Sequence, residues 1–403
     1  DEWSKDLNQS AMFGLFRRDY MTKARLLLTK LNKVSGPEKE SLIQFIDKIN
    51  KENSNRYNTF LYNLTSSSAR NVKEVKPIYS DNAELVDGRI ILRDNFHQMF
   101  EDIPEAMIFG EDVGKIGGVN QGVEGMQDKF GEERVADTGI RETTILGQGI
   151  GLSLRGLRPI AEIQYLDYLL YAFQTMADDL ASLHYRTYGG QISPVIIRTR
   201  GHRLEGIWHS GSPMGMIING TRGVNICVPR DMTRAAGFYN TLMISDEPAM
   251  VIECLNGYRT KEKMPSNIGE FRTPLGVIDV TKTGNDITLV SYGSTWRIVD
   301  DAANELEKLG ISCEVIDIQS IVPFDLNCEI VESVKKTNRL LVIDEDVPGG
   351  ASAYILQKII EDQKAYEYLD SSPSTLTAKA HRPPYGKDGD YFTKPSVNDV
   401  IEK

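Results

Sequence analysis

A single glutamate, Glu142, stands where a proton-transfer group would be effective. It follows the turn-rich stretch 137–141 (DTGIR) and opens a helical pattern of small and apolar residues that runs to Gly151. Further on, 158–165 (RPIAEIQY) has the pattern of a buried strand. A carboxyl group held away from water favours its protonated form and could exchange a proton with a ring nitrogen. The alternative is an ordinary acidic residue stabilised by a helix N-terminus.

Two histidines lie in loops that follow predicted strands. His209 is part of the glycine- and serine-rich segment 206–213 (GIWHSGSP), and His202 is part of the basic segment 200–203 (RGHR). Loops at the carboxyl ends of parallel strands carry ligand sites in α/β proteins, and a histidine there could transfer a proton near neutral pH. A structural histidine in a turn explains His209 equally well. The loop around His202 would suit a carboxylate substrate or a partner.

Two tyrosines, Tyr165 and Tyr168, follow the predicted strand that ends near Gln164. An aromatic ring at this position could stack on a planar heterocycle. Packing in the core is an equally good explanation for either ring. No G-x-S-x-G motif occurs, which disfavours a serine hydrolase.

The chain has two glycine-rich motifs that resemble ligand loops only superficially. The segment 147–151 (GQGIG) lacks the G-x-G-x-x-G spacing, and we expect its glycines to permit close helix packing. The segment 386–390 (GKDGD) is expected to be a surface turn.

Composition excludes several broad classes of function. The 403 residues are 40% hydrophobic and 26% charged, as in soluble globular proteins, and the net charge of -11 argues against nucleic-acid binding. No apolar run approaches the roughly 18 residues of a membrane span, and no signal-peptide pattern is present. The four cysteines are expected to be reduced core residues, which indicates the bacterial cytoplasm or an equivalent reducing compartment.

The first part of the chain differs from the rest. Helical apolar spacing at 21–31 and 42–49 is interrupted at 35–37 (SGP), which predicts a helical hairpin or arm. The polar stretch 65–76 is expected to be a linker.

From about residue 85 the pattern alternates between helices and short apolar strands, which predicts an α/β fold with a parallel sheet flanked by helices. Further strands and a helix closed by Gly310 indicate a second, smaller α/β domain after about residue 272. The expected strands are 106–114, 160–163, 195–198, 225–228, 250–253, 288–293, 313–318 and 340–343, and the expected helices are 89–100, 168–185, 232–244 and 297–309.

Together these segments resemble the β subunit of the thiamine diphosphate-dependent 2-oxoacid dehydrogenases, the decarboxylating component of those complexes. The resemblance covers residues from about 85 to 400, with order and spacing preserved. The matching segments are 108–114 (IFGEDVG), 137–142 (DTGIRE), 156–162 (GLRPIAE), 206–210 (GIWHS), 246–253 (DEPAMVIE), 289–294 (LVSYGS) and 314–318 (EVIDI).

The resemblance implies a transketolase-like pyrimidine-binding domain at 77–270 and a transketolase C-terminal-type domain at 271–403, and the residue pattern predicts a helical N-terminal arm and linker at 1–76 before them. It places Glu142 against the N1′ nitrogen of the cofactor's aminopyrimidine. His209 matches the active-site histidine that assists the reacting carbonyl or the transfer of the acyl group to lipoyl. The other residues that it implies at the cofactor are Tyr168, Tyr165, Ile140 and Glu111.

The family's magnesium-binding motif, Gly-Asp-Gly followed by an asparagine, is missing from this sequence. Only 14 residues follow Gly389, too few for the motif to be completed from 386–390. The resemblance therefore implies that the diphosphate and Mg²⁺ are held by an α-type partner subunit. It also implies a lipoyl acyltransferase partner and self-association of β subunits. The N-terminal arm exceeds what a β subunit needs and could be the remnant of an α–β fusion.

The segments 206–210 and 161–165 look closer to branched-chain 2-oxoacid enzymes, with pyruvate enzymes next. Acetoin dehydrogenases share similar segments and stay an alternative. A transketolase or deoxyxylulose phosphate synthase would need the Gly-Asp-Gly domain in the same chain. A non-catalytic scaffolding subunit of the same fold is the alternative outside enzymes, and the presence of Glu142 and His209 argues against it.

Overall fold

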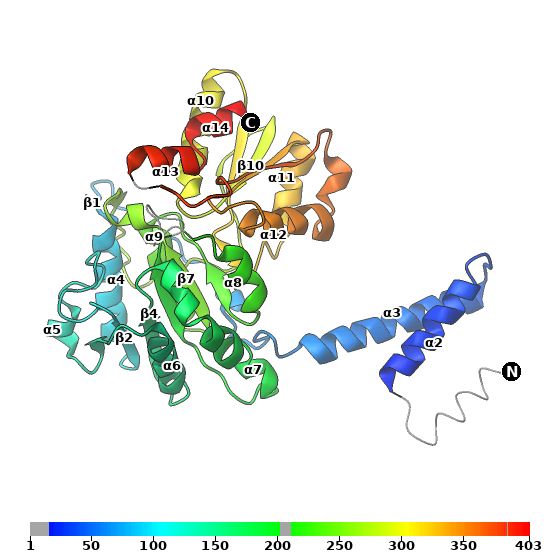
Figure 1. Ribbon diagram of the computed structural model, residues 1–403, viewed down its shortest axis with the longest axis horizontal. Coiled ribbons are helices and arrows are strands. Elements are labelled where there is room, and N and C mark those ends of the chain that lie inside the picture. The colour runs from blue at the N-terminus through cyan, green and yellow to red at the C-terminus, as the bar shows by residue number, and fades with distance from the viewer. Residues whose placement is uncertain (1–15, 202–210, 385) are drawn as a thin grey trace. The chain divides into compact units, whose positions relative to one another are not determined.

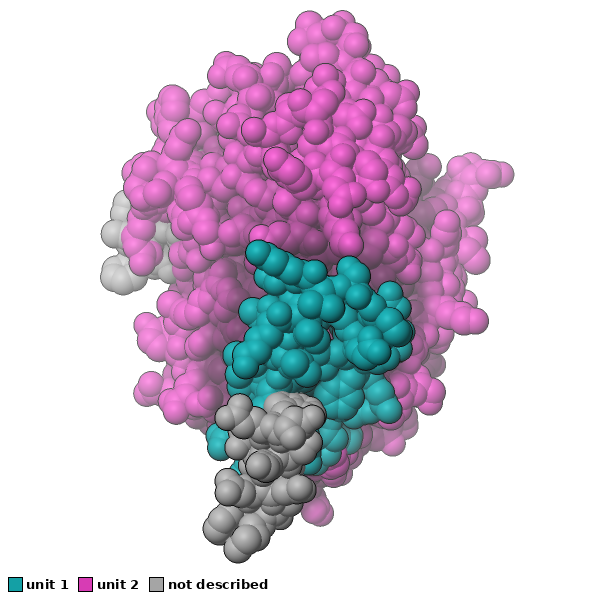
Figure 2. Space-filling model, turned by 90° about the vertical axis from the view of Figure 1, so that its right-hand side faces the viewer, with its two compact units in different colours: residues 1–60 teal, residues 61–403 magenta. Residues whose placement is uncertain are grey.

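The computed structural model describes residues 16–201, 211–384 and 386–403. The chain forms two compact units, 1–60 and 61–403, which are coloured separately in Figure 2. Among the described residues, no helix is both long enough and apolar enough to cross a bilayer.

The first unit contains an antiparallel pair of helices, as the apolar spacing predicts. Helix α2 (Arg17–Lys30) packs on α3 (Pro37–Asn58), and Pro37 takes the first helical position, where its missing N–H has no cost. The interior of the pair is small and consists of three buried side chains, Met21, Ala24 and Ile46.

A seven-stranded sheet forms the first half of the second unit (Figure 1). Its central strands are parallel, which confirms the predicted parallel sheet. The edge strand β12 is antiparallel and comes from much later in the chain, so local patterns did not reveal it. In spatial order the strands are β12 (Ser320–Val322), β6 (Asn225–Cys227), β7 (Ala249–Glu253), β5 (Ile196–Arg200), β4 (Arg158–Glu162), β2 (Ala106–Gly110) and β3 (Val135–Asp137).

Helices cover both faces of this sheet and bury a separate apolar core on each. On one face α4 (Gly88–Asp102) packs against α9 (Met232–Met243), and their inward side chains include Phe96 and Phe238. On the other face α6 (Glu142–Ser153) packs against β4. The layered α/β arrangement follows because strands that are buried on both faces need helices on each.

The segment expected as one helix at 168–185 is broken in the structure, so that prediction was wrong. It consists of the 3₁₀-helix η2 (Leu166–Tyr171), the π-helix η3 (Thr175–Ala181) and the short α7 (Leu183–Arg186). The buried residues Leu166, Leu169 and Ala172 recur every third position. That spacing keeps one face inward in a 3₁₀-helix, which has three residues per turn.

The second half of this unit is built on a five-stranded sheet, with strands β10, β11, β13 and β14 parallel and β9 antiparallel at one edge. Gly310 follows α10 with a φ of 84°, which only glycine adopts easily, and ends the helix as expected. The strand order is β14 (Ser374–Leu376), β13 (Leu340–Ile343), β10 (Ile287–Ser291), β11 (Cys313–Asp317) and β9 (Asp279–Lys282). The helices of this half are α10 (Thr295–Lys308), α11 (Glu329–Thr337), α12 (Ala351–Gln357), η5 (Lys358–Asp362), η6 (Ala365–Tyr368), α13 (Lys387–Thr393) and α14 (Val397–Glu402).

The remaining elements are short. They are η1 (Ala69–Asn71), β1 (Leu85–Asp87), α5 (Met126–Phe130), α8 (Met214–Gly220), η4 (Leu255–Tyr258) and β8 (Lys261–Lys263), of which β1 and β8 form an antiparallel pair.

Two further expectations need correction. The segment 386–390 is not a surface turn, because α13 begins at Lys387. Three cysteines are buried as expected, but Cys328 is exposed because it sits in a loop before α11 with a left-handed backbone. The pattern of apolar residues in the sequence does not reveal this loop.

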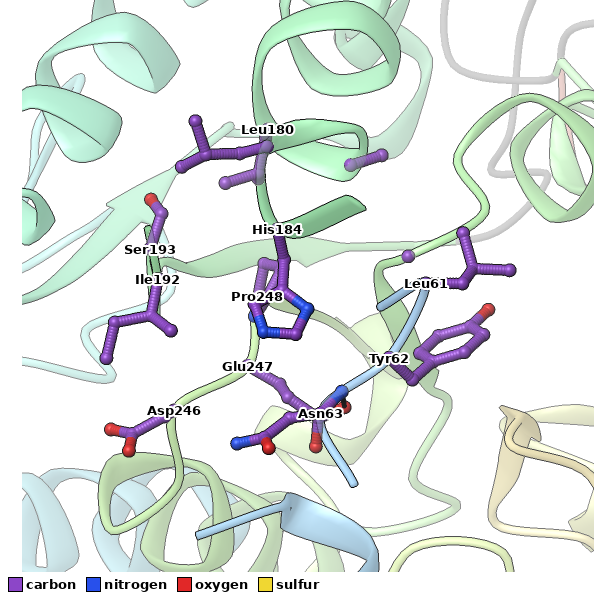
Figure 3. Close-up of a pocket in the computed structure, with 13 residues that line it drawn as sticks. Leu61, Tyr62, Asn63, Leu180, His184, Ile192, Ser193, Asp246, Glu247 and Pro248 are labelled. Atoms are coloured by element: carbon purple, nitrogen blue, oxygen red, sulfur yellow. Dashed lines mark hydrogen bonds between the residues drawn. The ribbon is translucent and has the colours of Figure 1, made fainter. Parts of the chain in front are cut away.

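The polar stretch expected as a linker is anchored to the body of the second unit. The buried carboxylate of Glu247 accepts hydrogen bonds from the backbone N–H of Asn63 (3.0 Å), the hydroxyl of Ser68 (2.8 Å) and the backbone N–H of Ala69 (2.7 Å). Figure 3 shows Glu247 and Asn63 side by side at this anchor. One buried carboxylate therefore holds both ends of the stretch 63–69.

Removing this carboxylate should loosen the stretch. We expect Glu247→Ala to lower the free energy of unfolding by about 3 kcal/mol, because three donors lose a charged acceptor in a buried place. Urea unfolding measures the loss, and trypsin should cleave faster after Arg70. The exposed Glu361 provides the control variant, Glu361→Ala. Equal stability of the two variants would contradict the anchor.

Candidate active site

Glu142 is the first residue of α6 and is only 6% exposed. A carboxylate suits this position because the first N–H groups of a helix have no acceptor within the helix. The small residues that follow bring α6 close to the sheet: a side chain at Gly149 would lie 3.3 Å from Ala161 Cβ and 3.2 Å from a methyl of Val195. Close packing was expected of all three glycines, but Gly147 and Gly151 have no neighbour at that range.

Three predicted site residues come together at the carboxyl ends of neighbouring strands. Glu111 follows β2, Glu142 follows β3 by way of a short loop, and Tyr168 lies in η2 after β4. Burial raises the pKa of Glu111, and the negative charges of Glu142, Asp112 and Glu162 raise it further. Burial likewise raises the pKa of Tyr168, followed by the charges of Tyr165, Glu111 and Glu142. The two carboxyl groups and the phenol therefore share one electrostatic environment.

The two tyrosines lie ring to edge beside this pair of carboxyl groups. Their ring centroids are 5.8 Å apart with planes at 85°. The chain before them is held by Gln164, whose side chain donates to Asp112 Oδ2 (3.1 Å) and whose backbone carbonyl accepts from Arg200 (3.1 Å). The segment that carries the rings is thus held by contacts with Asp112, which follows β2, and with Arg200 of β5, the two strands on either side of β4.

The other predicted site residues stand apart from this group. Ile140 is 81% exposed, so within this chain its side chain contacts little. His209 and His202 lie outside the described residues. The described chain continues at Gly211, whose N–H donates to Asp167 Oδ1 (2.6 Å). Asp167 lies in η2 between the two tyrosines in sequence, and this contact links η2 to the segment that begins at Gly211.

A buried network of charges lies beneath the site, at the ends of β4, β5 and β7. Arg198 donates to Glu162 Oε2 (2.6 Å) and to both carboxylate oxygens of Glu253 (2.9 and 3.2 Å). Arg200 donates to Glu162 Oε2 (3.0 Å), and both guanidinium groups contact the hydroxyl of Tyr258. All five side chains are buried.

Opposite charges balance one another within this network. Burial alone would lower the pKa of Arg198, but the charges of Glu253, Tyr258 and Glu162 raise it well above its ordinary value. Burial alone would raise the pKa of Glu253, and Arg198 outweighs that effect and lowers it. Arg198 and Glu253 therefore keep their opposite charges, and charge-assisted hydrogen bonds join the three strands.

Sequence reasoning missed this network, although a signal was present. Strand β7 is apolar up to Glu253 at its carboxyl end, β4 is apolar between Arg158 and Glu162, and β5 continues from two isoleucines into Arg198 and Arg200. Charged side chains are almost never fully buried unless they are paired. Such a pattern in adjacent parallel strands thus predicts an internal ion-pair network.

Comparison with known proteins places this geometry in a family. The domain models "Transketolase, pyrimidine binding domain" and "Transketolase, C-terminal domain" match residues 86–260 and 276–398. The pyruvate dehydrogenase E1 component subunit beta of Staphylococcus epidermidis and that of Staphylococcus aureus are each 33% identical over 305 residues, which cover 74% of this chain and 91% of theirs. This chain belongs to the β subunits of the thiamine diphosphate-dependent 2-oxoacid dehydrogenases.

Solved structures confirm the fold of this β-subunit family. A structure titled "Split gene transketolase, inactive beta4 tetramer" superposes with a TM-score of 0.63 at 19% identity, covering 78% of this chain and 95% of that one. A transketolase-like pyrimidine-binding domain followed by a C-terminal α/β domain, after a helical N-terminal region, is therefore confirmed as the fold class.

The site residues fit one end of the family's cofactor. A buried carboxyl group at a helix start and a pair of tyrosines suit the nitrogen and the flat face of an aminopyrimidine. In the described part of the chain, no group of three or more His, Cys, Asp or Glu side chains lies together as around a metal ion.

The network makes a strong prediction for stability. We expect Arg198→Met to lower the free energy of unfolding by about 3–5 kcal/mol, because it leaves Glu162 and Glu253 buried with too few positive partners. Chemical denaturation measures the change. Lys308→Met, which removes an exposed pair with Glu305, should change the same quantity by less than about 1 kcal/mol. Similar losses in the two variants would mean that the network does not stabilise the sheet.

Proposed function

We propose that this chain is the β half of a thiamine diphosphate-dependent 2-oxoacid dehydrogenase and supplies the residues that contact the pyrimidine end of the cofactor. The observation that carries this proposal is Glu142, a nearly buried carboxyl group that opens α6 beside Glu111 and Tyr168. The family relationship of the whole fold gives that geometry its chemical meaning.

Thiamine diphosphate, when bound, would supply the carbanion that attacks the 2-oxo carbon and would hold the electron pair that remains when carbon dioxide leaves. The part played by this chain is acid–base and positional. Glu142 would hold and exchange the proton at the pyrimidine N1′. Tyr168 and Tyr165 would pack against the ring, while Glu111 frames the site and keeps negative charge close to Glu142. His209 would assist the reacting carbonyl or acyl transfer.

The surface beside Glu142 supports a site that is completed by another chain. Ile140 is 81%, Leu170 is 55% and Tyr171 is 68% exposed, and the Thr143 hydroxyl joins these segments by donating to the Tyr171 carbonyl. Apolar side chains gathered at a functional site mark an interaction surface. We propose that an α-type subunit covers them and carries the diphosphate and Mg²⁺.

Further partners follow from the same proposal. The acyl group would pass to the lipoyl group of an acyltransferase, and β subunits would associate with one another in a heterotetramer. For the substrate, segments 206–210 and 161–165 favour a branched-chain 2-oxoacid, whereas the names of the similar staphylococcal proteins favour pyruvate. We retain the branched-chain acid as the first candidate.

Exchanging the acid at Glu142 for an amide tests its role. In the enzyme reconstituted with an α-type subunit, we expect Glu142→Gln to reduce the decarboxylation rate by at least roughly 10²-fold, because an amide cannot exchange the N1′ proton. Circular dichroism should show an unchanged fold.

The control for this variant is Glu132→Gln, an exposed glutamate in the loop before β3, which should retain full activity. Titration of thiamine diphosphate, followed by calorimetry, separates a loss of cofactor binding from a loss of chemistry. Turnover by Glu142→Gln at the rate of the Glu132→Gln enzyme would remove Glu142 from its proposed role.

The dependence on a partner is a separate prediction. We expect the purified chain to decarboxylate no 2-oxoacid, and its mixture with an α-type subunit that carries the Gly-Asp-Gly motif to do so. The mixture should act on a branched-chain 2-oxoacid with a higher kcat/KM than on pyruvate. Activity is followed with an artificial electron acceptor, and complex formation by analytical ultracentrifugation. Full activity of the chain alone would overturn the half-site proposal, and a preference for pyruvate would overturn only the substrate assignment.

A further inference from the structure

A cavity lies at the opposite edge of the seven-stranded sheet from Glu142. Its volume is about 340 Å³, and it opens between the loop after β12, the helices α12 and η5, and the anchored stretch that begins the second unit. Strand β12 is one edge of the sheet, and β3, which leads to Glu142, is the other edge. This cavity is therefore separate from the candidate active site.

Aromatic rings line the cavity together with two positive groups, Arg70 and Lys358, and two carboxylates, Asp325 and Asp362. Phe324 and Tyr354 meet edge to face with centroids 6.3 Å apart. The guanidinium carbon of Arg70 lies 4.1 Å from the centroid of the Tyr62 ring. The ammonium nitrogen of Lys358 lies 5.5 Å from the centroid of the Tyr354 ring. Rings and cations in this arrangement offer flat apolar surfaces next to positive charge.

Two polar atoms in the cavity wall lack hydrogen-bond partners. Arg70 Nε is buried without an acceptor, and no carboxylate lies within ion-pair distance of Arg70 in the described part of the chain. The amide nitrogen of Gln363 donates to Asp325 Oδ2 (2.8 Å), and Oε1 of the same side chain is buried without a donor. Lys358, in contrast, already pairs with Asp362 (2.6 Å). Both atoms are closed to water, so what the cavity offers a ligand is the guanidinium of Arg70 as a whole, a cation that forms no ion pair in the described part of the chain.

The loop that forms the cavity floor is held in an unusual conformation. Asp325 and Cys328 have φ values of 20° and 54°, which are uncommon for residues other than glycine. The buried carboxylate of Asp325 keeps this shape by accepting from the backbone N–H of Glu329 (3.0 Å) and of Ile330 (2.9 Å). Backbone strain that is held in place by such contacts is concentrated at ligand sites.

We propose that this cavity binds a small planar aromatic anion, independently of the function proposed for Glu142. The ring would lie against Tyr62, Phe324 and Tyr354. Its carboxylate or phosphate would pair with the guanidinium of Arg70. Two sources share this chemistry, namely nucleoside monophosphates and aromatic carboxylic acids, and both fit a pocket at the lower end of the size range of ligand sites.

The exposed thiol of Cys328 allows a direct test in the full-length chain. It lines the cavity, and the other three cysteines of the protein are buried, so a maleimide probe should label this position alone. We expect adenosine monophosphate or 4-hydroxyphenylacetate to slow labelling at least about tenfold at saturation. Adenosine, which lacks the anion, and inorganic phosphate, which lacks the ring, should each protect much less, since each makes only part of the contacts.

A variant pair tests the role of the guanidinium. Arg70→Met should weaken the protecting ligand at least about tenfold, because it removes a charge-assisted hydrogen bond. Arg70→Lys should restore part of the affinity, and Arg155→Met, an exposed arginine away from the cavity, should leave it unchanged. Thermal unfolding checks that each variant is folded, and Lys358→Met provides a second variant of the cavity.

The compound that protects Cys328 identifies the source of the ligand. The proposal is overturned if neither planar anion slows labelling at concentrations up to about 10 mM, which corresponds to affinities too weak to matter. It is also overturned if phosphate alone protects as well as the planar anions, or if folded Arg70→Met binds them as tightly as the unchanged protein.

Discussion

The pairing of Arg198 and Arg200 with Glu162 and Glu253 is the constraint on which the active-site end of this chain depends. Buried charges of this kind must satisfy one another, because no water is available to do so. Since the four residues sit at the carboxyl ends of three adjacent strands, their mutual geometry sets the relative positions of those ends. The segments that carry Tyr165, Tyr168 and Gly211 all leave from this fixed edge.

Local patterns were sufficient to predict the parallel sheet and the position of Glu142, because apolar periodicity and helix-start chemistry act over a few residues. Features that rest on distant contacts were not predictable in this way. The antiparallel edge β12 and the anchor at Glu247 each depend on partners far away in sequence. The exposed Cys328 belongs partly to the same group, since Asp325, which shapes its loop, also accepts from the side-chain amide of Gln363, 38 residues further on.

The inner and outer sides of the proposed active site differ in how much of their surroundings this chain supplies. On the side of the sheet, Glu142 is buried, and Glu111 and the two tyrosines are partly buried among the chain's own residues. On the outer side, Ile140 and Tyr171 face away from the fold. Positioning of the proton-transfer group is thus a property of this chain, whereas exclusion of water from the reaction would have to come from a second chain.

Strand β12 has a consequence for the order in which the protein can fold during synthesis. The sheet of the pyrimidine-binding domain is complete only when Ser320 and Val322 pair with Cys227 and Ile226, roughly a hundred residues earlier. Until the ribosome has produced that part of the chain, β6 presents an open edge to neighbouring nascent chains, and such edges template aggregation. The two domains are therefore distinct in architecture, but the first cannot complete its sheet until the second has begun to be synthesised. Dividing the gene between them would separate the first sheet from its own edge strand.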